Sequence, residues 1–130
     1  MKNVSLIYAF TAVLVSASPS LAETLAQKYK GPHGLSTYEM TAALMAGIRD
    51  CEIRSPGFKD KARPYLARVY ANKNYQKITN SKEYKNPQLA MDADVFISEQ
   101  RTGQNINDIC KQTLGGLPGF ENEFNRVELK

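Results

Sequence analysis

The residues best suited to covalent chemistry are two cysteines, Cys51 and Cys110, which lie far apart in a chain of 130 residues. Each stands on the apolar face of a predicted helix. The pattern of residues 1–22 predicts that the chain is exported, and two such cysteines in an exported chain usually pair. We therefore predict a disulfide between them, and its long loop would stabilise the fold by roughly 4 kcal/mol. Two buried thiols, or one reactive thiol, are the alternatives.

Groups for acid–base or metal chemistry are scarce. The single histidine, His33, falls in a Pro-His-Gly turn, and a histidine-dependent nucleophile would have to use it. Asp92 and Asp94 resemble the start of a calcium loop, but the later acid and glycine are missing and the segment is typical of a helix. We predict no catalytic residue, no metal site and no cofactor. A hydrolase with a carboxylate pair assembled by the fold is the alternative.

Positive charge is concentrated in residues 59–85, where eight basic side chains outnumber two acidic ones for a net charge of +6. Tyrosines are interspersed, and this combination favours an anionic partner. Because a step of five residues turns a helix by about 140°, the tyrosines cannot share one face. We expect Tyr65 to pack inward and Tyr70 or Tyr75 to face solvent. The predicted binding residues here are Arg68, Lys73, Tyr75 and Lys77; a solvated face without a partner is the alternative.

The C-terminal segment, residues 118–130, forms the second part of the predicted binding surface. Phe120, Phe124 and Val127 are spaced by four and three residues, which predicts a short amphipathic helix after a sharp corner at Leu117-Pro118-Gly119. Two interpretations stay open. The phenylalanines either cap the core of the domain itself, or they expose an apolar edge to a partner or to a second copy of the chain.

Residues 1–22 have the pattern of a secretory signal peptide. Lys2 precedes a mostly apolar run of about twelve residues, and Ser20 and Ala22 are small residues at the expected cleavage site. The run is too short for a transmembrane helix, which needs roughly 20 residues. Cleavage would leave residues 23–130 with 16 basic and 13 acidic side chains, a net charge of +3. We predict a periplasmic protein, with an extracellular one as the alternative.

The elements that must position these residues are all helices. Residues 23–35 form a lead-in and a turn, and residues 36–130 form one helical domain. Its clearest helix runs from Ser36 to Arg54, because Ser36 and Glu39 form a capping box. Met40, Leu44, Ile48 and Cys51 lie on its apolar face.

Start and stop signals place the later helices. We expect a second helix to open at Ser55-Pro56, to break or kink at Pro64, and to continue towards Thr79. Two further helices open at Asn86-Pro87 and at Asn105, and glycines at 103 and 115–116 end them. No strand pattern is present. The fold class is therefore all-α, a small bundle of four or five helices stapled by one disulfide.

The functional expectation is a small exported module that binds a partner and does no catalysis, such as an accessory or inhibitor of an envelope complex. Its partner would be an envelope protein or an anionic envelope surface, and export argues against nucleic acid. A homodimer is possible. In general plan, an exported helical domain with one disulfide resembles the acid-stress chaperones of the bacterial periplasm. This resemblance implies the alternative of a stress chaperone, and it transfers no residue.

Overall fold

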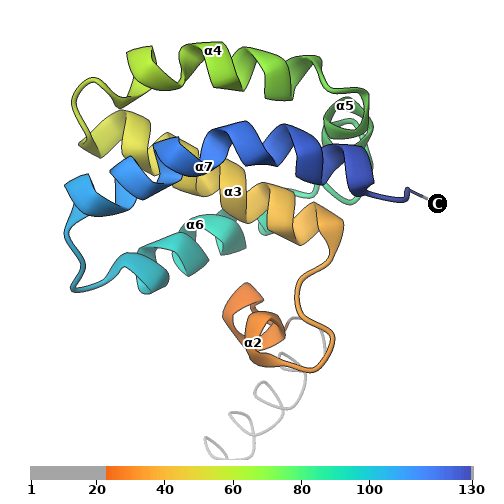
Figure 1. Cartoon of the computed structure of the whole chain (residues 1–130). Coiled ribbons are helices and arrows are strands. Elements are labelled where there is room, and N and C mark those ends of the chain that lie inside the picture. Colours follow the sequence, from red (N-terminus) through yellow and green to blue (C-terminus); the bar gives the residue numbers. More distant parts are fainter. Residues whose placement is uncertain (1–22, 130) are drawn as a thin grey trace, which may run out of the picture. The chain divides into compact units, whose positions relative to one another are not determined.

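The computed structural model describes residues 23–129, and the predicted signal peptide, residues 1–22, lies outside this range. The described residues belong to two units, residues 23–34 and residues 35–129, which we describe separately. The described residues form six helices and no strand, which confirms the predicted all-α class (Figure 1).

The described part of the first unit is one short helix and a turn. Helix α2, Leu25–Lys30, begins with a capping box: the Thr24 hydroxyl accepts from the Gln27 amide at 3.2 Å, and the Gln27 side chain accepts from the Thr24 amide at 2.9 Å. His33 is exposed in the turn that follows. The predicted helical lead-in is therefore present.

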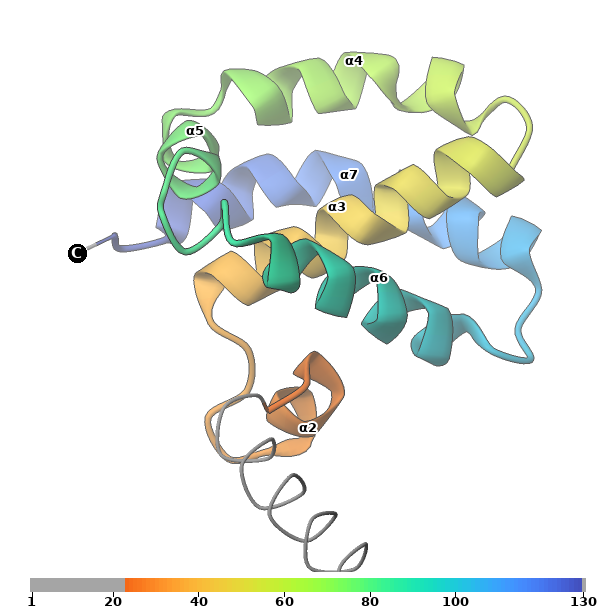
Figure 2. The same cartoon turned by 180° about the vertical axis from the view of Figure 1, so that it is seen from behind.

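The second unit is built around helix α3. Its five helices are α3 (Thr37–Arg54), α4 (Phe58–Ala71), α5 (Lys73–Thr79), α6 (Pro87–Arg101) and α7 (Ile106–Arg126). Helix α3 packs against α6 on one side and against α4 and α7 on the other, while α4 and α7 also pack together. Two opposite views both place α4 and α6 on opposite sides of α3 (Figures 1 and 2).

The core lies mainly between α3, α4 and α7. Its fully buried side chains include Ile48 from α3, Ala62 from α4 and Leu117 from α7. A second cluster joins Val69 of α4, Ile78 of α5 and Phe124 of α7. Burial of the larger of these apolar side chains, each contributing about 1.5–3 kcal/mol, holds the short helices in place.

Helix α3 begins where the sequence predicts. Ser36 accepts from the Glu39 amide at 3.2 Å, and the Glu39 carboxylate accepts from the Ser36 amide at 2.9 Å. Its buried face includes Ile48 and Cys51, as expected. The prediction that Met40 lies on this buried face is wrong, because Met40 is 60% exposed.

The second helical stretch begins later than predicted and is interrupted at a different residue, although it ends at Thr79 as predicted. Ser55 ends α3, where its amide donates to the Cys51 carbonyl, and α4 begins only after Gly57. Gly57 has a φ of +82°, a conformation that glycine adopts without strain. Pro64 lies at an exposed position inside a continuous helix. The break comes later, at Asn72, whose side chain caps the separate helix α5.

Helix α7 differs most from the prediction. It runs without interruption from Ile106 to Arg126, so Gly115-Gly116 does not end it and Pro118 forms no corner. Leu117 is 1% exposed and Phe124 is 6% exposed, so the helix is fixed in the core both before and after Pro118. Packing therefore overrides the weak helix propensity of the glycines and the proline. The segment from residue 118 is the second half of α7 and not a separate tail helix.

Candidate functional site

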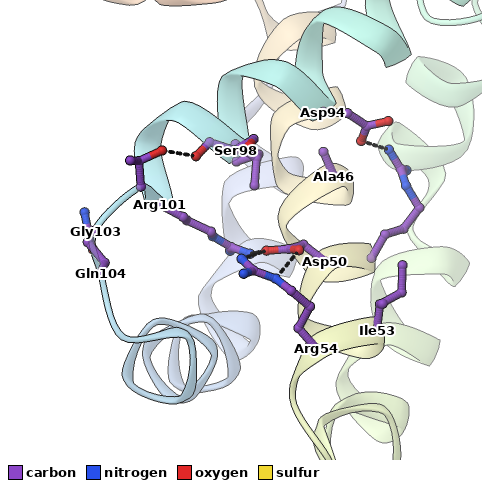
Figure 3. Close-up of a pocket in the computed structure, with 12 residues that line it drawn as sticks. Ala46, Asp50, Ile53, Arg54, Asp94, Ser98, Arg101, Gly103 and Gln104 are labelled. Carbon is purple, nitrogen blue, oxygen red and sulfur yellow. Dashed lines mark hydrogen bonds and ion pairs between the residues drawn. The ribbon is translucent and has the colours of Figure 1, made fainter.

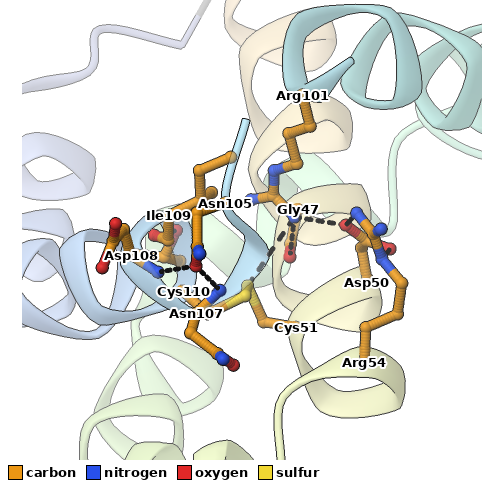
Figure 4. The surroundings of a disulfide bond; sticks show 11 residues. Gly47, Asp50, Cys51, Arg54, Arg101, Asn105, Asn107, Asp108, Ile109 and Cys110 are labelled. Atoms are coloured by element: carbon orange, nitrogen blue, oxygen red, sulfur yellow. Dashed lines mark hydrogen bonds and ion pairs between the residues drawn. A yellow bond between two sulfur atoms is a disulfide. The ribbon is translucent and has the colours of Figure 1, made fainter. Parts of the chain in front are cut away.

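The predicted disulfide between Cys51 and Cys110 is present and is buried. The two Cα atoms are 5.5 Å apart, and the residues are 0% and 1% exposed. The bond joins the last turns of α3 to the first turns of α7 (Figure 4). Asn105 caps α7 next to this bond by accepting from the amides of Asn107 and Asp108.

Arg101, the last residue of α6, reaches across to α3 beside the disulfide. Its Nη1 donates to the Gly47 carbonyl at 3.1 Å, to Asp50 Oδ2 at 2.6 Å and to Cys51 Sγ at 3.6 Å (Figure 4). The side chain is only 10% exposed. Because Gly47 has no Cβ, the guanidinium fits directly against the backbone of α3. The atoms nearest to the position of a Cβ at residue 47 belong to this side chain and to Ile97.

Asp50 is held between two arginines. Arg54 binds both carboxylate oxygens, at 2.7 and 2.8 Å, while Arg101 binds Oδ2 from the opposite helix. The hydrogen bond from Arg54 is the main cause that lowers the pKa of Asp50. Burial of the carboxylate opposes this effect, and the hydrogen bond from Arg101 lowers the pKa further. The same bond raises the pKa of Arg54. One carboxylate thus faces two guanidinium groups.

These groups line a cleft between α3 and α6 (Figure 3). Its volume is about 640 Å³, within the range of roughly 300–1,000 Å³ that small-molecule sites occupy. Arg49 and Asp94, which are 3.0 Å apart, form a second ion pair in it. Ile53 and Ile97 supply apolar walls.

Both carboxylates of this cleft, Asp50 and Asp94, are ion-paired with arginines. Within residues 23–129, no group of three or more histidine, cysteine, aspartate or glutamate side chains is arranged to hold a metal ion.

The basic residues of the 59–85 segment lie on α4, on α5 and on the loop after α5. All eight are exposed, and we call them the basic face: Lys59, Lys61, Arg63, Arg68, Lys73, Lys77, Lys82 and Lys85. Of these eight residues, only Arg63 has an ion-pair partner within the described part of the chain, which is Asp60 at 2.8 Å. Helix α6 lies on the far side of α3 (Figure 1). It carries three acidic residues, Asp92, Asp94 and Glu99, and one basic residue, Arg101. The basic face and helix α6 therefore differ in charge.

The tyrosines of this segment are placed differently from the expectation. Tyr65 is 36% exposed and so does not pack inward, and Tyr70 is 42% exposed as predicted. Tyr75 is partly buried; its ring lies 5.5 Å from that of Phe124 in an edge-on arrangement. Burial raises the pKa of Tyr75 to about 12. Tyr75 thus belongs to the edge of the core, whereas the basic predicted residues are free to contact a partner.

The two phenylalanines of α7 pack into the core of the domain itself, as one of the two interpretations expects. Phe124 is 6% exposed and Phe120 is partly buried, and both pack against the core. An apolar groove of about 210 Å³ remains between α3 and α7, lined in part by Met40, Phe120 and Val127. A role in binding for these residues stays a prediction.

Sequence reasoning missed the arginine cleft. The spacing of Asp50 and Arg54 is a recognisable helix ion pair, and it was the one local signal available. Arg101 is 51 residues from Asp50 in the chain. Only the packing of α6 on α3 brings the two together.

Comparison with protein-family models, curated proteins and solved structures gives no match for this chain. Within residues 23–129, no helix is both long enough and apolar enough to cross a bilayer.

Proposed function

We propose that this chain is a small exported binding protein without catalytic activity, which attaches to an anionic partner of the cell envelope through its basic face. The observation that carries the proposal is the set of seven exposed basic side chains on α4, α5 and the following loop without an ion-pair partner among the described residues. Unpaired like charges on one small unit repel one another, and an anionic partner relieves this cost.

Export is supported by two features. The sequence of residues 1–22 fits a cleaved signal peptide, and a buried disulfide fits an oxidising compartment such as the periplasm or the medium. Absence of catalysis is supported by the state of the cleft carboxylates, which are engaged in ion pairs. The proposed role is therefore attachment to a component of the cell envelope.

Binding of the mature chain, residues 23–130, to lipid vesicles tests the proposal. We expect sedimentation with phosphatidylglycerol vesicles and not with phosphatidylcholine vesicles, and release as salt screens the charges. Each basic residue near an anionic membrane contributes about 1 kcal/mol. A variant with Arg68→Ser, Lys73→Ser and Lys77→Ser should therefore lose most of the binding.

The matched control removes three exposed basic residues outside the basic face: Lys30→Ser, Lys111→Ser and Arg126→Ser. The control has the same net charge as the first variant. If both variants lose binding equally, net charge and not the basic face is responsible. If the parent binds neither kind of vesicle, the proposed anionic surface is wrong.

A further inference from the structure

The cleft between α3 and α6 carries a charge that its own residues do not neutralise. Three guanidinium groups, those of Arg49, Arg54 and Arg101, face two carboxylates, those of Asp50 and Asp94. If all five groups are charged, the cleft has a net charge of +1. A single anionic group would balance it.

Hydrogen-bond donors remain available there. Arg101 uses Nη1 for all of its hydrogen bonds, and within residues 23–129 neither its Nε nor its Nη2 donates to another residue. This side chain is nine-tenths buried. Arg54 uses Nε and Nη2 for Asp50, which leaves its Nη1 without a protein acceptor in the described chain. Guanidinium groups of this kind bind carboxylates with strong, charge-assisted hydrogen bonds.

The remaining walls are suited to an apolar group. Ile53 lines the cleft and is 83% exposed, so most of its aliphatic surface is in contact with water. Ile97 of α6 is partly buried in the cleft. A ligand that places a short aliphatic body against these two side chains would remove apolar surface from water.

We propose that the α3–α6 cleft binds a small organic carboxylate, with its charged group at Arg54 and Arg101 and its aliphatic body against Ile53 and Ile97. A monoanion is favoured over a doubly charged phosphate because the excess charge is one and Asp50 and Asp94 repel further negative charge. This site is separate from the basic face and does not depend on the proposed function.

Titration of the mature chain with hexanoate tests the site, with acetate, hexylammonium and inorganic phosphate as comparison ligands. We expect saturable binding of hexanoate in nuclear magnetic resonance spectra, with shifts in the arginine Nε signals of the cleft and in the methyl signals of Ile53 and Ile97. Acetate should bind more weakly, because it lacks the aliphatic body. Hexylammonium should not bind.

Two variants at exposed positions separate the two parts of the site. Arg54→Gln, at a side chain 48% exposed, should weaken hexanoate binding about tenfold. Ile53→Ser should weaken hexanoate about fivefold and leave acetate unchanged. Arg63→Gln, the same change on the outer surface of α4, should have no effect.

Three results would overturn the inference. The first is the absence of saturable shifts with hexanoate, in which case the arginines serve only to join α6 to α3. The second is an affinity that Arg54→Gln and Arg63→Gln change equally. The third is tighter binding of phosphate than of hexanoate, which would contradict a carboxylate ligand.

Discussion

The guanidinium of Arg101 lies across Gly47, with Nη2 3.0 Å from the position that a Cβ atom of residue 47 would occupy. Alanine in place of a helical glycine normally stabilises by about 1 kcal/mol. Here the added methyl group would push a buried side chain by a few tenths of an ångström and weaken its hydrogen bonds, so we expect Gly47→Ala to lower the free energy of unfolding by about 1 kcal/mol. Urea denaturation followed by circular dichroism measures the change.

Gly115 provides the control for that substitution. It is exposed in α7, and a Cβ there would meet nothing within 4 Å. Gly115→Ala should therefore raise the free energy of unfolding by about 1 kcal/mol. The same change at two helical glycines should thus have opposite signs, and stabilisation by both would refute the close approach of Arg101 to Gly47.

Arg101 and Arg49 should differ sharply in their contribution to stability. Both pair with an aspartate of the α3–α6 cleft, but the Arg101 side chain is 10% exposed and that of Arg49 is 46% exposed. We expect Arg101→Met to lower the free energy of unfolding by about 2 kcal/mol, because the Gly47 carbonyl and Asp50 lose a buried donor. Arg49→Met should cost less than about 1 kcal/mol. Equal losses in urea denaturation would contradict the structural difference between the two pairs.

Acid should weaken the fold through Asp50. The arginine hydrogen bonds hold the pKa of its folded-state carboxyl below the unfolded value of about 3.9, so the ion pairs stabilise the protein fully above that pH and lose this effect as the pH falls through the folded-state pKa. Asp50→Asn should therefore be less stable than the parent at pH 7, and the difference should shrink below about pH 4. A difference that stays constant down to pH 2 would show that the charge of Asp50 does not matter.

Loss of the disulfide should be the largest single perturbation. Cys51→Ala with Cys110→Ala opens a long loop of the unfolded chain, which predicts a loss of roughly 4 kcal/mol. Urea denaturation of the parent with and without a reducing agent separates the cross-link from the packing of the sulfur atoms. If reduction leaves the urea midpoint unchanged, the bond contributes nothing to stability.

Local signals in the sequence correctly located the features that depend only on residues close together in the chain. The capping box at Ser36 and the caps at Asn86 and Asn105 are all present, because each needs only a side chain within three residues of a helix start. The pairing of Cys51 with Cys110 followed from the presence of only two cysteines and from the predicted export of the chain.

Features that depend on tertiary packing could not be located in this way. Helix α7 passes through Gly115-Gly116 and Pro118 because Leu117 and Phe124 are fixed in the core, and no local rule contains that information. The arginine cleft was missed for the same reason: Arg101 joins Asp50 only because α6 packs on α3. The basic face was visible in the composition, but the exposure of Tyr65 and the burial of Tyr75 were not.

The position of the disulfide has a consequence for the protein under proteolytic attack. Helices α4, α5 and α6 all lie between Cys51 and Cys110 in the chain. One cut by a protease within this stretch, for example in the exposed loop at Lys82 and Glu83, would leave both fragments joined by the sulfur–sulfur bond. The nicked molecule would keep its mass apart from one added water, and its fragments would separate only after reduction.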